Sequence, residues 1–356
     1  MAAGPLTEPA FWQGRSVLLT GHTGFVGGWL ALALCQLGAR VTGFALPPEG
    51  DPNLFTLAAI DRDIHSIMGD LRDAHAVSAA VERAAPEVVF HLAAQPLVRA
   101  AHARPVETFE VNLLGTVHLL EALRRGGGPG APGATVVMTT DKVYRDAESA
   151  TPFREDDELG GSEPYSASKA AAEFAVAAYR RSYAPGGALA TLRAGNILGG
   201  GDWGPDRIIP DAVRAFLKDE TLVLRNPAAI RPWQHVNDVL AGALSLAEAL
   251  WRDPQGIGTA WNFGPPLEQQ CTVEELVRAF CDAWGGGTYR VEPRDDVPET
   301  AVLKLDSSRA RDSLGWRRRY DLQSAIRETV AWYKAYGEGR DMAAHSRTAL
   351  ADFLTT

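Results

Sequence analysis

The sequence predicts an α/β protein with a doubly wound parallel sheet and a smaller α/β subdomain toward its C-terminus. Short apolar runs of strand length alternate with longer helical stretches over most of the chain, which is typical of a parallel sheet covered by helices on both faces. After Ala188 this alternation gives way to long loops and separated helices. The 356 residues are enough for one large domain or two.

Composition narrows the class of protein. The hydrophobic content of 46% and the charged content of 22% are values of globular proteins. The net charge of −9 argues against general binding to nucleic acids or anionic membranes. Because Cys35, Cys271 and Cys281 show neither a disulfide framework nor metal-ligand spacing, we expect buried reduced thiols and no bound metal. The absence of a signal pattern and of an apolar run of about 18 residues predicts a soluble cytoplasmic protein.

The chain opens with a strand, a glycine-rich turn, a helix and a second strand. Residues 16–20 have the pattern of a short apolar strand, residues 29–37 that of an apolar helix, and residues 40–46 that of the next strand. The turn at residues 21–28 separates the first strand from the helix. This order of elements is the context in which a glycine-rich turn binds a dinucleotide in a Rossmann-type fold.

Three glycines of this turn have separate expected roles. Gly21 allows the tight turn, Gly24 lets the backbone approach a pyrophosphate, and Gly27 lets the helix pack closely. The pyrophosphate is expected at the N-terminus of the helix, where free N–H groups and the helix dipole favour anions. The turn residues expected to contact the cofactor are Gly21, Thr23, Gly24, Phe25, Val26 and Gly27.

The second strand lacks the acidic residue that usually holds the adenosine ribose of NAD. Residues 40–46 contain no Asp or Glu, and Glu49 and Asp51 lie beyond two prolines. Arg40, at the start of the strand, is not placed to hold the 2′-phosphate of NADP. The strand therefore leaves the choice between NAD and NADP open and predicts loose binding of the cofactor.

Two further strands lead to residues that can line a cofactor site. The strand at residues 64–68 is followed by Asp70 and Leu71. Asp70 can accept a hydrogen bond from the adenine amine, or it can cap the helix that follows. The strand at residues 88–92 leads to small residues against which a cofactor can lie. The small residues are Ala93 and Ala94, and the amide side chain of Gln95 follows them.

The remaining elements complete the predicted sheet and the subdomain. Residues 196–205 have the composition of a long irregular loop, and such loops in compact domains are usually functional. The tail at residues 340–356 is expected to be a short helix or a frayed end. Helices are predicted at residues 105–123, 165–183, 209–217, 239–251, 272–284 and 322–336, and further strands at residues 134–138, 190–193 and 260–264.

The stretch from Thr139 to Lys169 carries the expected chemistry. Tyr165 and Lys169 are four residues apart and therefore share one face of a helix. An ammonium beside a phenol favours the phenolate and lowers its pKa, so Tyr165 is expected to act as a base near neutral pH. Two of the five lysines of the chain lie in this stretch.

Polar residues at the end of the preceding strand are expected to join this pair around one small volume. They are Thr140, Asp141 and Lys142, and Thr139 before them is a candidate for contact with the cofactor. The alternative for Asp141 and Lys142 is an exposed ion pair, since charged loop residues are commonly solvated.

Taken together, several motifs resemble the extended short-chain dehydrogenase/reductase superfamily, and in particular its sugar-nucleotide branch. The resemblance covers nearly the whole chain. It is carried by the glycine-rich turn, by Gly69-Asp70-Leu71, by His91-x-Ala93-Ala94-Gln95, by Asn112 and by Tyr165-x-x-x-Lys169.

Within this branch, further segments resemble the CDP-glucose 4,6-dehydratase family. The Asp141-Lys142 pair is the most informative, because the similar dTDP-glucose dehydratases carry Asp-Glu there. Residues 235–238 are closer to the wider superfamily. The other segments that carry the resemblance are residues 93–99, 193–196, 200–203, 231–236 and 303–306.

The resemblance implies a bound NAD and a redox-neutral conversion of CDP-glucose to CDP-4-keto-6-deoxyglucose. It implies that Tyr165, helped by Lys169 and Thr140, takes the proton of the sugar 4-hydroxyl, while hydride passes from C4 to the nicotinamide and later returns to C6. Lys142 is the candidate base for the C5 proton, and Asp141 is the candidate acid for the departing 6-hydroxyl. Such a base must be neutral and such an acid protonated, which burial favours.

Five residues are candidates for holding the nucleotide-sugar substrate. Asn196 and Arg231 are expected at the pyrophosphate, since Arg suits bidentate phosphate contacts. The alternative for Arg231 is an ordinary surface charge. Gln95 and Arg99 are expected to line the sugar site, and Arg207 is a further substrate-binding candidate.

Two domains are expected. Residues 1–190, with residues 230–264 returning to them, would form the dinucleotide-binding Rossmann domain. Residues 191–229 and 265–356 would form the substrate-binding subdomain. A homodimer is also expected, since the helices predicted on either side of Thr139 carry more small and apolar residues than one sheet face can bury, and the resemblance implies the same.

Two other functions are compatible with parts of the sequence. The first is another enzyme of the same superfamily, a nucleotide-sugar 4-epimerase or a GDP-mannose 4,6-dehydratase-like enzyme. The Asp141-Lys142 pair argues against an epimerase, which needs no acid and base beside Thr140. The second is a non-catalytic nucleotide-binding regulator, and the intact Tyr165 and Lys169 pair argues against it.

Overall fold

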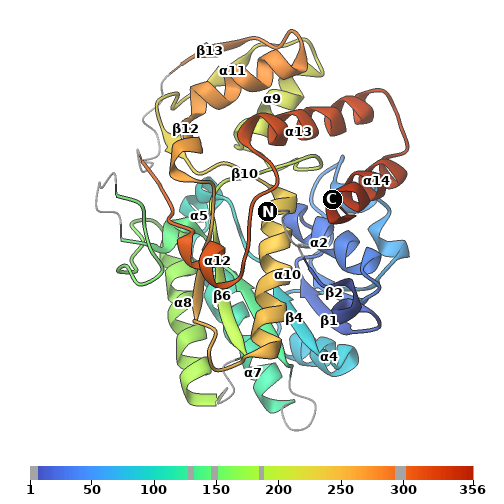
Figure 1. Ribbon diagram of the computed structural model, residues 1–356, viewed down its shortest axis with the longest axis vertical. Coiled ribbons are helices and arrows are strands. Elements are labelled where there is room, and N and C mark those ends of the chain that lie inside the picture. Colours follow the sequence, from blue (N-terminus) through green and yellow to red (C-terminus); the bar gives the residue numbers. More distant parts are fainter. Residues whose placement is uncertain (1–6, 127–131, 146–150, 184–187, 293–301, 356) are drawn as a thin grey trace.

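A parallel sheet forms the centre of the protein (Figure 1). The computed structural model describes residues 7–126, 132–145, 151–183, 188–292 and 302–355, and within them this sheet has seven strands. All of its pairings are parallel. In sheet order the strands are β3 (His65–Met68), β2 (Arg40–Ala45), β1 (Ser16–Thr20), β4 (Val88–His91), β5 (Ala134–Met138), β6 (Leu189–Ala194) and β11 (Ala260–Phe263). The order reverses beside β1, and open α/β sheets bind ligands at the carboxyl ends of strands next to such a point.

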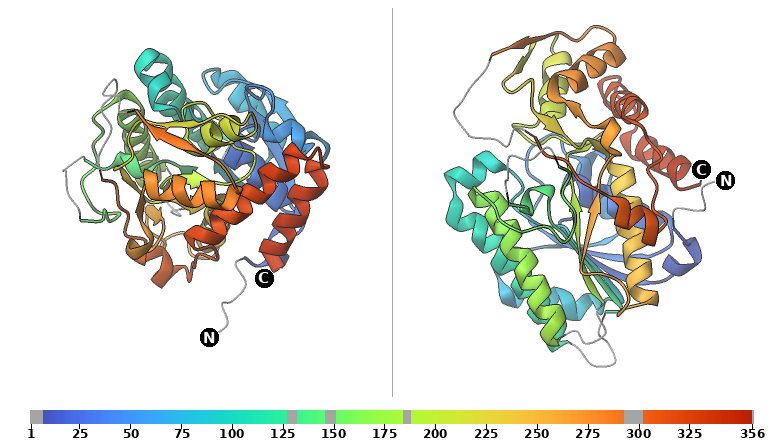
Figure 2. Two further views of the ribbon diagram at one scale, coloured as in Figure 1. Left: turned by 90° about the horizontal axis from the view of Figure 1, so that it is seen from above. Right: turned by 60° about the vertical axis from the view of Figure 1, so that its left-hand side comes forward.

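Helices cover both faces of the sheet, so the predicted doubly wound α/β fold is confirmed. One face carries α1 (Pro9–Trp12), α2 (Phe25–Gln36) and α10 (Val236–Arg252), and the other carries α4 (Ala74–Ala84), α7 (Gly115–Arg125) and α8 (Pro164–Tyr183). The right-hand view of Figure 2 shows α8 and α10 on opposite sides of the sheet. Separate apolar clusters fill the two interfaces.

A smaller group of elements lies above the carboxyl edge of the sheet, at the top of Figure 1. It contains β7 (Ile197–Leu198), α9 (Ile208–Phe216), β8 (Leu222–Leu224), β9 (Ile230–Arg231), β10 (Gln234–His235), β12 (Cys271–Thr272), α11 (Val273–Trp284), β13 (Tyr289–Val291) and α13 (Leu322–Gly337). The tail forms a helix, α14 (Met342–Thr355), which packs on α13 and α2. The domain boundaries stay a prediction, and the one at residue 190 falls inside β6.

The helix predicted at residues 105–123 is interrupted. After α5 (Val98–Ala103), it consists of α6 (Pro105–Phe109), a π-helical turn at Glu110–Leu114, and α7. The buried Asn112 in that turn accepts a hydrogen bond from the N–H of Gln95 (2.8 Å) and donates one to Ser168 Oγ (2.9 Å). The wider turn thus lets one side chain join the loop after β4 to α8, and π-turns are frequent at functional sites.

Helix starts and short elements differ from the prediction for local reasons. Helix α2 begins at Phe25 instead of Trp29, because Gly24 is its N-cap. Helix α10 begins at Val236, because the His235 side chain caps it. Several short elements were not predicted. Among them are α1, α5, β7 and β12, together with α3 (Leu54–Leu57), the paired strands β8 and β13, and α12 (Ser308–Ser313) beside β11.

In the described part of the chain, no helix is both long and apolar enough to cross a membrane. The same residues contain no group of three or more His, Cys, Asp or Glu side chains able to hold a metal ion. The cysteines are free thiols, but only Cys281 is buried, whereas Cys35 and Cys271 are partly exposed. Burial nevertheless raises the pKa of Cys271 to about 11, so its thiol is unsuited to nucleophilic catalysis near neutral pH.

Candidate active site

The carboxyl end of β5 and the start of α8 meet at one point. Thr140 caps a short 3-10 turn at Asp141–Val143 by accepting a hydrogen bond from the N–H of Lys142. The Thr140 side chain also hydrogen-bonds the phenol of Tyr165, on which Asp141 and Arg207 act electrostatically. The structure therefore brings together the two segments that the sequence placed around one volume, and it adds Arg207 to them.

Asp141 is 3% exposed, so the alternative of an exposed Asp141–Lys142 ion pair is wrong. Its Oδ1 accepts a hydrogen bond from the Thr140 hydroxyl (3.1 Å), whereas Oδ2 has no partner among the described residues. Burial raises the pKa of Asp141 to about 6, although the charge of Lys142 acts in the opposite direction. The raised pKa expected of an acid is confirmed, and the unpaired Oδ2 is an atom from which Asp141 can donate a proton.

Lys169 lies one turn along α8 from Tyr165, but the expected lowering of the phenol pKa is wrong for this structure. Burial raises the pKa of Tyr165 to about 12, and the hydrogen bond with Thr140 is the largest opposing effect. The Lys169 ammonium instead donates to the carbonyl oxygen of Met138 at the end of β5 (3.1 Å). Burial lowers the pKa of Lys169 to about 8, opposed by Glu173. Because its ammonium bonds a backbone oxygen, Lys169 anchors α8 to β5.

The glycine-rich turn has the geometry that a dinucleotide needs. Gly21 has φ +82°, and a Cβ there would lie 2.7 Å from the backbone nitrogen of Ala93. A Cβ on Gly27 would lie 2.1 Å from the carbonyl oxygen of Gly21, so only glycine lets α2 begin this close to the turn. Gly24 caps a helix of 12 residues whose first N–H groups are available to an anion. Phe25 and Val26 form the first turn of α2, and Thr23 Oγ1 donates to the carbonyl of Leu46 (2.9 Å).

The segment after β3 differs from the prediction in one respect. Asp73, not Asp70, caps α4 by accepting hydrogen bonds from the N–H groups of His75 and Ala76. Asp70 is held by a bidentate pair with Arg72, whose shortest contact is 2.6 Å. The capping alternative for Asp70 is therefore wrong, and its role toward adenine stays a prediction. Leu71 is a buried core residue.

The segment after β4 lies against the glycine-rich turn. Ala93 N–H donates to Thr20 Oγ1 (3.1 Å), and the backbone of Ala93 lies so close to Gly21 that a Cβ on Gly21 would be 2.7 Å from the Ala93 nitrogen. The Gln95 side chain donates to Thr108 Oγ1 (3.0 Å) and accepts from the N–H of Leu97 (2.6 Å). These bonds hold the amide of Gln95 between α6, which carries Thr108, and the loop that carries Gln95 itself. Ala94 lies between these residues and is half-buried.

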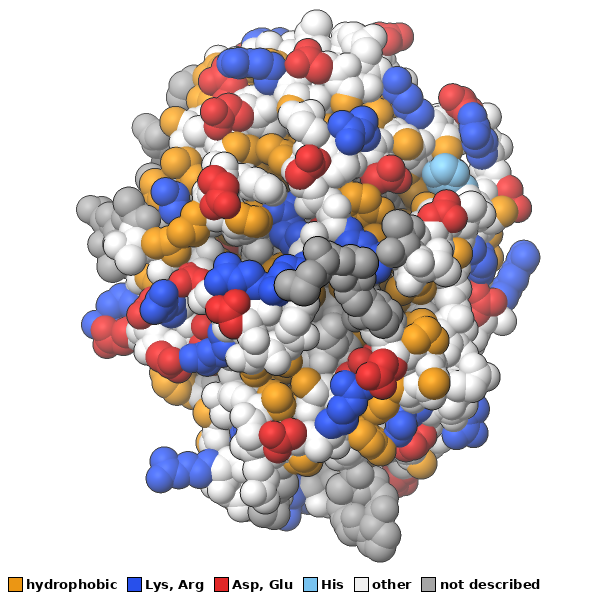
Figure 3. Space-filling model, in the orientation of Figure 1, with side chains coloured by type: hydrophobic (Ala, Val, Ile, Leu, Met, Phe, Trp, Pro, Cys, Tyr) orange, Lys and Arg blue, Asp and Glu red, His pale blue; other side chains and the backbone are white. Residues whose placement is uncertain are grey.

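Arginines from several elements act on the candidate catalytic residues or lie near them. Arg231 on β9 is 5% exposed, so the surface-charge alternative is wrong, and its charge acts on Asp141. Arg207 pairs with Asp202 (3.0 Å) while acting on Tyr165. Arg99 on α5 lies 3.7 Å from Asp206. Asp206 and Arg207 belong to the same loop. Figure 3 shows Lys and Arg side chains gathered near the centre of this face, where the upper elements meet the sheet layer.

Asn196 lies at the start of the loop that follows β6. Its carbonyl oxygen accepts a hydrogen bond from the N–H of Gln234 (2.9 Å), and its side chain is half-buried. This bond joins the loop to the strand β10, but within the described parts of the chain no hydrogen bond links the Asn196 amide to the other candidate residues. Its expected contact with a pyrophosphate stays a prediction.

Comparison with known proteins identifies the family. The GDP-mannose 4,6 dehydratase family matches residues 18–329. The chain belongs to this family. The CDP-glucose 4,6-dehydratase of Salmonella typhimurium is 40% identical to it, over 98% of this chain and 99% of that protein. The predicted membership of the extended short-chain dehydrogenase/reductase superfamily is thereby confirmed.

Solved structures agree with this family assignment. The UDP-glucose 4-epimerase of Thermus thermophilus, solved in complex with NAD, is 27% identical, has a TM-score of 0.76, and covers 89% of this chain and 98% of that one. The dTDP-glucose 4,6-dehydratase of Bacillus anthracis in complex with NAD is 21% identical, has the same TM-score of 0.76, and covers 93% and 100%. The similarity to the Bacillus anthracis structure supports the assigned fold.

One residue of the dehydratase-family site was not assigned a role from the sequence. Asp202 is 4% exposed and fixes Arg207 through its carboxylate, while its own carbonyl accepts a hydrogen bond from Tyr333 on α13 (2.5 Å). The spacing of an acid and an arginine in a glycine-rich loop was the available signal. This spacing alone does not indicate a role for Asp202. The role becomes visible only in the structure, where Tyr333 on α13 bonds the same loop.

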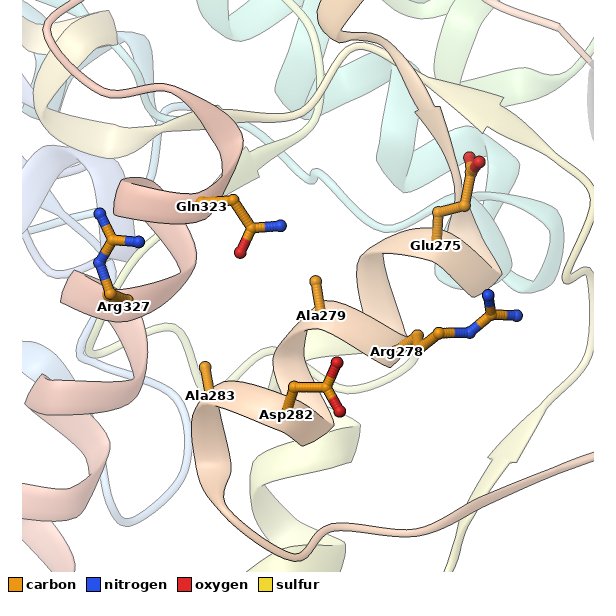
Figure 4. A pocket seen from close by; sticks show the side chains of 7 residues that line it. All are labelled: Glu275, Arg278, Ala279, Asp282, Ala283, Gln323 and Arg327. Carbon is orange, nitrogen blue, oxygen red and sulfur yellow. The ribbon is translucent and has the colours of Figure 1, made fainter.

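A surface depression elsewhere does not belong to this site. It has a volume of about 400 Å³ and lies between α11 and α13 (Figure 4). Its charged side chains include Glu275, Arg278, Asp282 and Arg327, which extend from the two helices. Such mixed charges are typical of a solvated helix face, and none of these residues is a predicted site residue.

Proposed function

We propose that this protein is a CDP-glucose 4,6-dehydratase, which converts CDP-glucose to CDP-4-keto-6-deoxyglucose and water with NAD as its cofactor. Two things support this substrate: the 40% identity to the Salmonella typhimurium enzyme over nearly the whole of both chains, and the Asp141-Lys142 pair. The cytoplasmic location expected from the sequence remains part of the proposal.

The observation that best supports a dehydratase reaction is the burial and raised pKa of Asp141. A buried carboxyl with a raised pKa and one unpaired oxygen lies beside Lys142, Thr140 and Tyr165. Oxidation of an alcohol needs Tyr165 and its neighbours alone, but loss of water also needs an acid and a base. The arrangement therefore favours a dehydratase over a 4-epimerase.

Each residue then has a proposed task. When bound along the glycine-rich turn, NAD would supply reversible hydride transfer between C4 and C6 of the sugar, so the net reaction would be redox-neutral. Tyr165, held by Thr140, takes the proton of the 4-hydroxyl. Lys142 removes the C5 proton made acidic by the 4-keto group and later returns it. Asp141 protonates the 6-hydroxyl, which leaves as water.

The proposed binding groups surround these catalytic residues. The cofactor lies against Gly21, Gly24 and Gly27, where a Cβ would collide with backbone or narrow the approach, and along the segment from Ala93. Arg231 and Arg207 are proposed to hold the substrate pyrophosphate, with Asn196 beside them. Arg99 is proposed to act at the sugar end, and Thr139 and Lys169 at the nicotinamide ribose.

The test is to incubate the purified protein with NAD and CDP-glucose and to follow the nucleotide sugar by mass. A loss of one water is expected. An isomer of unchanged mass would indicate an epimerase, and no conversion of any nucleoside-diphosphate sugar would indicate a non-catalytic protein. Parallel reactions with dTDP-glucose and GDP-mannose decide the nucleotide.

We expect added NAD to stimulate the purified enzyme, and NADP to do so less. The end of β2 offers no acidic side chain for the adenosine ribose and no basic side chain for a 2′-phosphate, so NAD loses one contact and NADP gains none. The measurement is the initial rate at increasing concentrations of each cofactor. If the enzyme purifies saturated with NAD and added cofactor does not change its rate, the prediction of loose NAD binding is wrong. If NADP stimulates it more than NAD, the predicted preference for NAD is wrong.

We expect a homodimer formed through α6–α7 and α8. Large apolar side chains are exposed on these helices: Val106 (70%), Leu114 (48%), Phe174 (61%) and Tyr183 (56%). Exposed apolar surface of this kind commonly marks a protein interface. Light scattering at micromolar concentration is expected to give twice the chain mass of 38.2 kDa, and Phe174→Glu is expected to shift it toward the monomer. A wild-type protein that is wholly monomeric would refute this assembly.

A further inference from the structure

A buried ion pair lies directly behind the catalytic segment Thr140–Lys142. The side chains of Glu173 on α8 and Arg193 on β6 are each 4% exposed. Arg193 binds the carboxylate through two nitrogens, at 3.0 Å from Nε to Oε1 and at 2.8 Å from Nη2 to Oε2. Thr191 Oγ1 donates a further bond to Oε2 (2.8 Å). A buried pair with this bidentate geometry and no missing partner is rigid and sensitive to the loss of either member.

The pair holds the catalytic segment at both of its ends. Just before the segment, Thr139 Oγ1 donates to Glu173 Oε1 (2.5 Å). Just after it, Arg193 Nη1 donates to the Tyr144 hydroxyl (2.9 Å), and that hydroxyl donates to Asn262 Oδ1 (2.6 Å). The residues that flank the segment are therefore fixed to one ion pair.

The same pair holds the other half of the site. Glu173 is one helical turn beyond Lys169 on α8, and the charge of Glu173 raises the pKa of Lys169 against the effect of burial. Lys169 in turn bonds the Met138 carbonyl just ahead of Thr139. These polar contacts therefore join α8 to the segment after β5, in addition to the packing of Val143 and Tyr144 against Ala170 on α8.

We propose that Glu173, Arg193 and Tyr144 are positioning residues, which set the separation between the Thr140–Lys142 segment and Tyr165. This inference rests on the proposed dehydratase function. Oxidation at C4 depends on Tyr165, whereas loss of water depends on Asp141 and Lys142. A small displacement between the two halves is therefore expected to uncouple loss of water from oxidation.

The sharpest test is Tyr144→Phe, which removes the hydroxyl that joins Arg193 to Asn262. The ring remains stacked on Phe153, at 4.8 Å between centroids and an interplanar angle of 2°, so the fold is expected to persist. Product formation is expected to fall about 10–100-fold, as for misplacements of about 1 Å, with KM for CDP-glucose and the affinity for NAD changed less than about twofold. Absorbance of reduced nicotinamide during turnover is expected to rise above that of the wild type.

A matched control is Tyr289→Phe on β13, which loses one hydroxyl bond to Glu274 (3.0 Å) far from the segment. It is expected to keep both the rate and the nicotinamide signal of the wild type. If Tyr144→Phe behaves like this control, or loses activity only in proportion to a lower melting temperature with an unchanged nicotinamide signal, the inference is wrong.

A second variant, Glu173→Gln, gives a readout that a purely structural role would not move. Among the described residues, the titratable groups coupled to Lys169 are Glu173 on α8 and His91 on β4, where the charge of Lys169 adds to burial in lowering the His91 pKa to about 3. Removing the Glu173 charge lowers the Lys169 pKa further, so the ammonium is lost at a lower pH. The alkaline limit of activity is expected to move to lower pH, and an unmoved limit would argue against the electrostatic part of the inference.

Failure of the proposed function is recognised separately. If the wild type releases no water from CDP-glucose, the function is wrong, and a crystal structure of Tyr144→Phe still decides the positioning. Displacement of Asp141 relative to Tyr165 by more than about 0.5 Å, the tolerance of catalytic groups, would support it. An unmoved Asp141 would overturn it.

Discussion

Replacing Tyr165 with Phe is expected to lower the turnover of CDP-glucose by about 10²–10⁴-fold, the range for acid–base groups, while nucleotide binding survives. The variant lacks the phenol that takes the proton of the 4-hydroxyl, so neither oxidation nor the later steps can begin. The ring itself stays half-buried at the start of α8, and the fold should be unaffected. The measurements are the rate of water loss and the binding of CDP-glucose by calorimetry.

A control for this variant lies on the same helix. Tyr179→Phe removes a hydroxyl that bonds Glu121 (3.3 Å), away from the candidate site, and activity close to wild type is expected. Retention of activity within about tenfold in Tyr165→Phe, against the range expected of an acid–base group, would count against Tyr165 as the base. Since burial raises the phenol pKa to about 12 in the structure, Tyr165 is protonated near neutral pH, and its proton must leave as the substrate and cofactor bind.

The second large effect is expected for Lys142→Met. Tyr165 and Lys169 remain, so the first oxidation is possible, but no neighbouring group is proposed to take the C5 proton. Formation of 4-keto-6-deoxy product is expected to fall by about 10²–10⁴-fold. On mixing with substrate, the variant should accumulate absorbance in the reduced-nicotinamide band, which stopped-flow spectroscopy can follow.

The exposed Lys218→Met is the matched control for loss of one lysine charge, and it should behave as the wild type. Lys142→Glu is a sharper probe, because it recreates the Asp-Glu pair of the dTDP-glucose relatives and supplies another base. Part of the activity is expected to return with glutamate but not with methionine. Product formation by Lys142→Met at the wild-type rate would show that Lys142 is an ordinary charge near the surface and that another residue is the base.

Much of the fold and of the site follows from local patterns. The glycine spacing predicts a dinucleotide turn because only glycine tolerates φ +82° at Gly21 and the close approach at Gly27. The alternation of apolar strands and helices predicts the parallel sheet, because each element must bury one face. The four-residue spacing of Tyr165 and Lys169 places them on one helix face, since that is a property of the helix itself.

The tertiary structure alone decides the pKa values and the hydrogen-bond partners of these residues. Burial raises the pKa of Asp141, whose Oδ2 has no partner among the described residues. Burial also raises the Tyr165 pKa, where the sequence predicted a lowered one. The direction of the Lys169 ammonium depends on the position of a carbonyl on β5, which is 31 residues away in the chain. Spacing fixes which side chains share a face, but desolvation and partner choice depend on what other elements pack against that face.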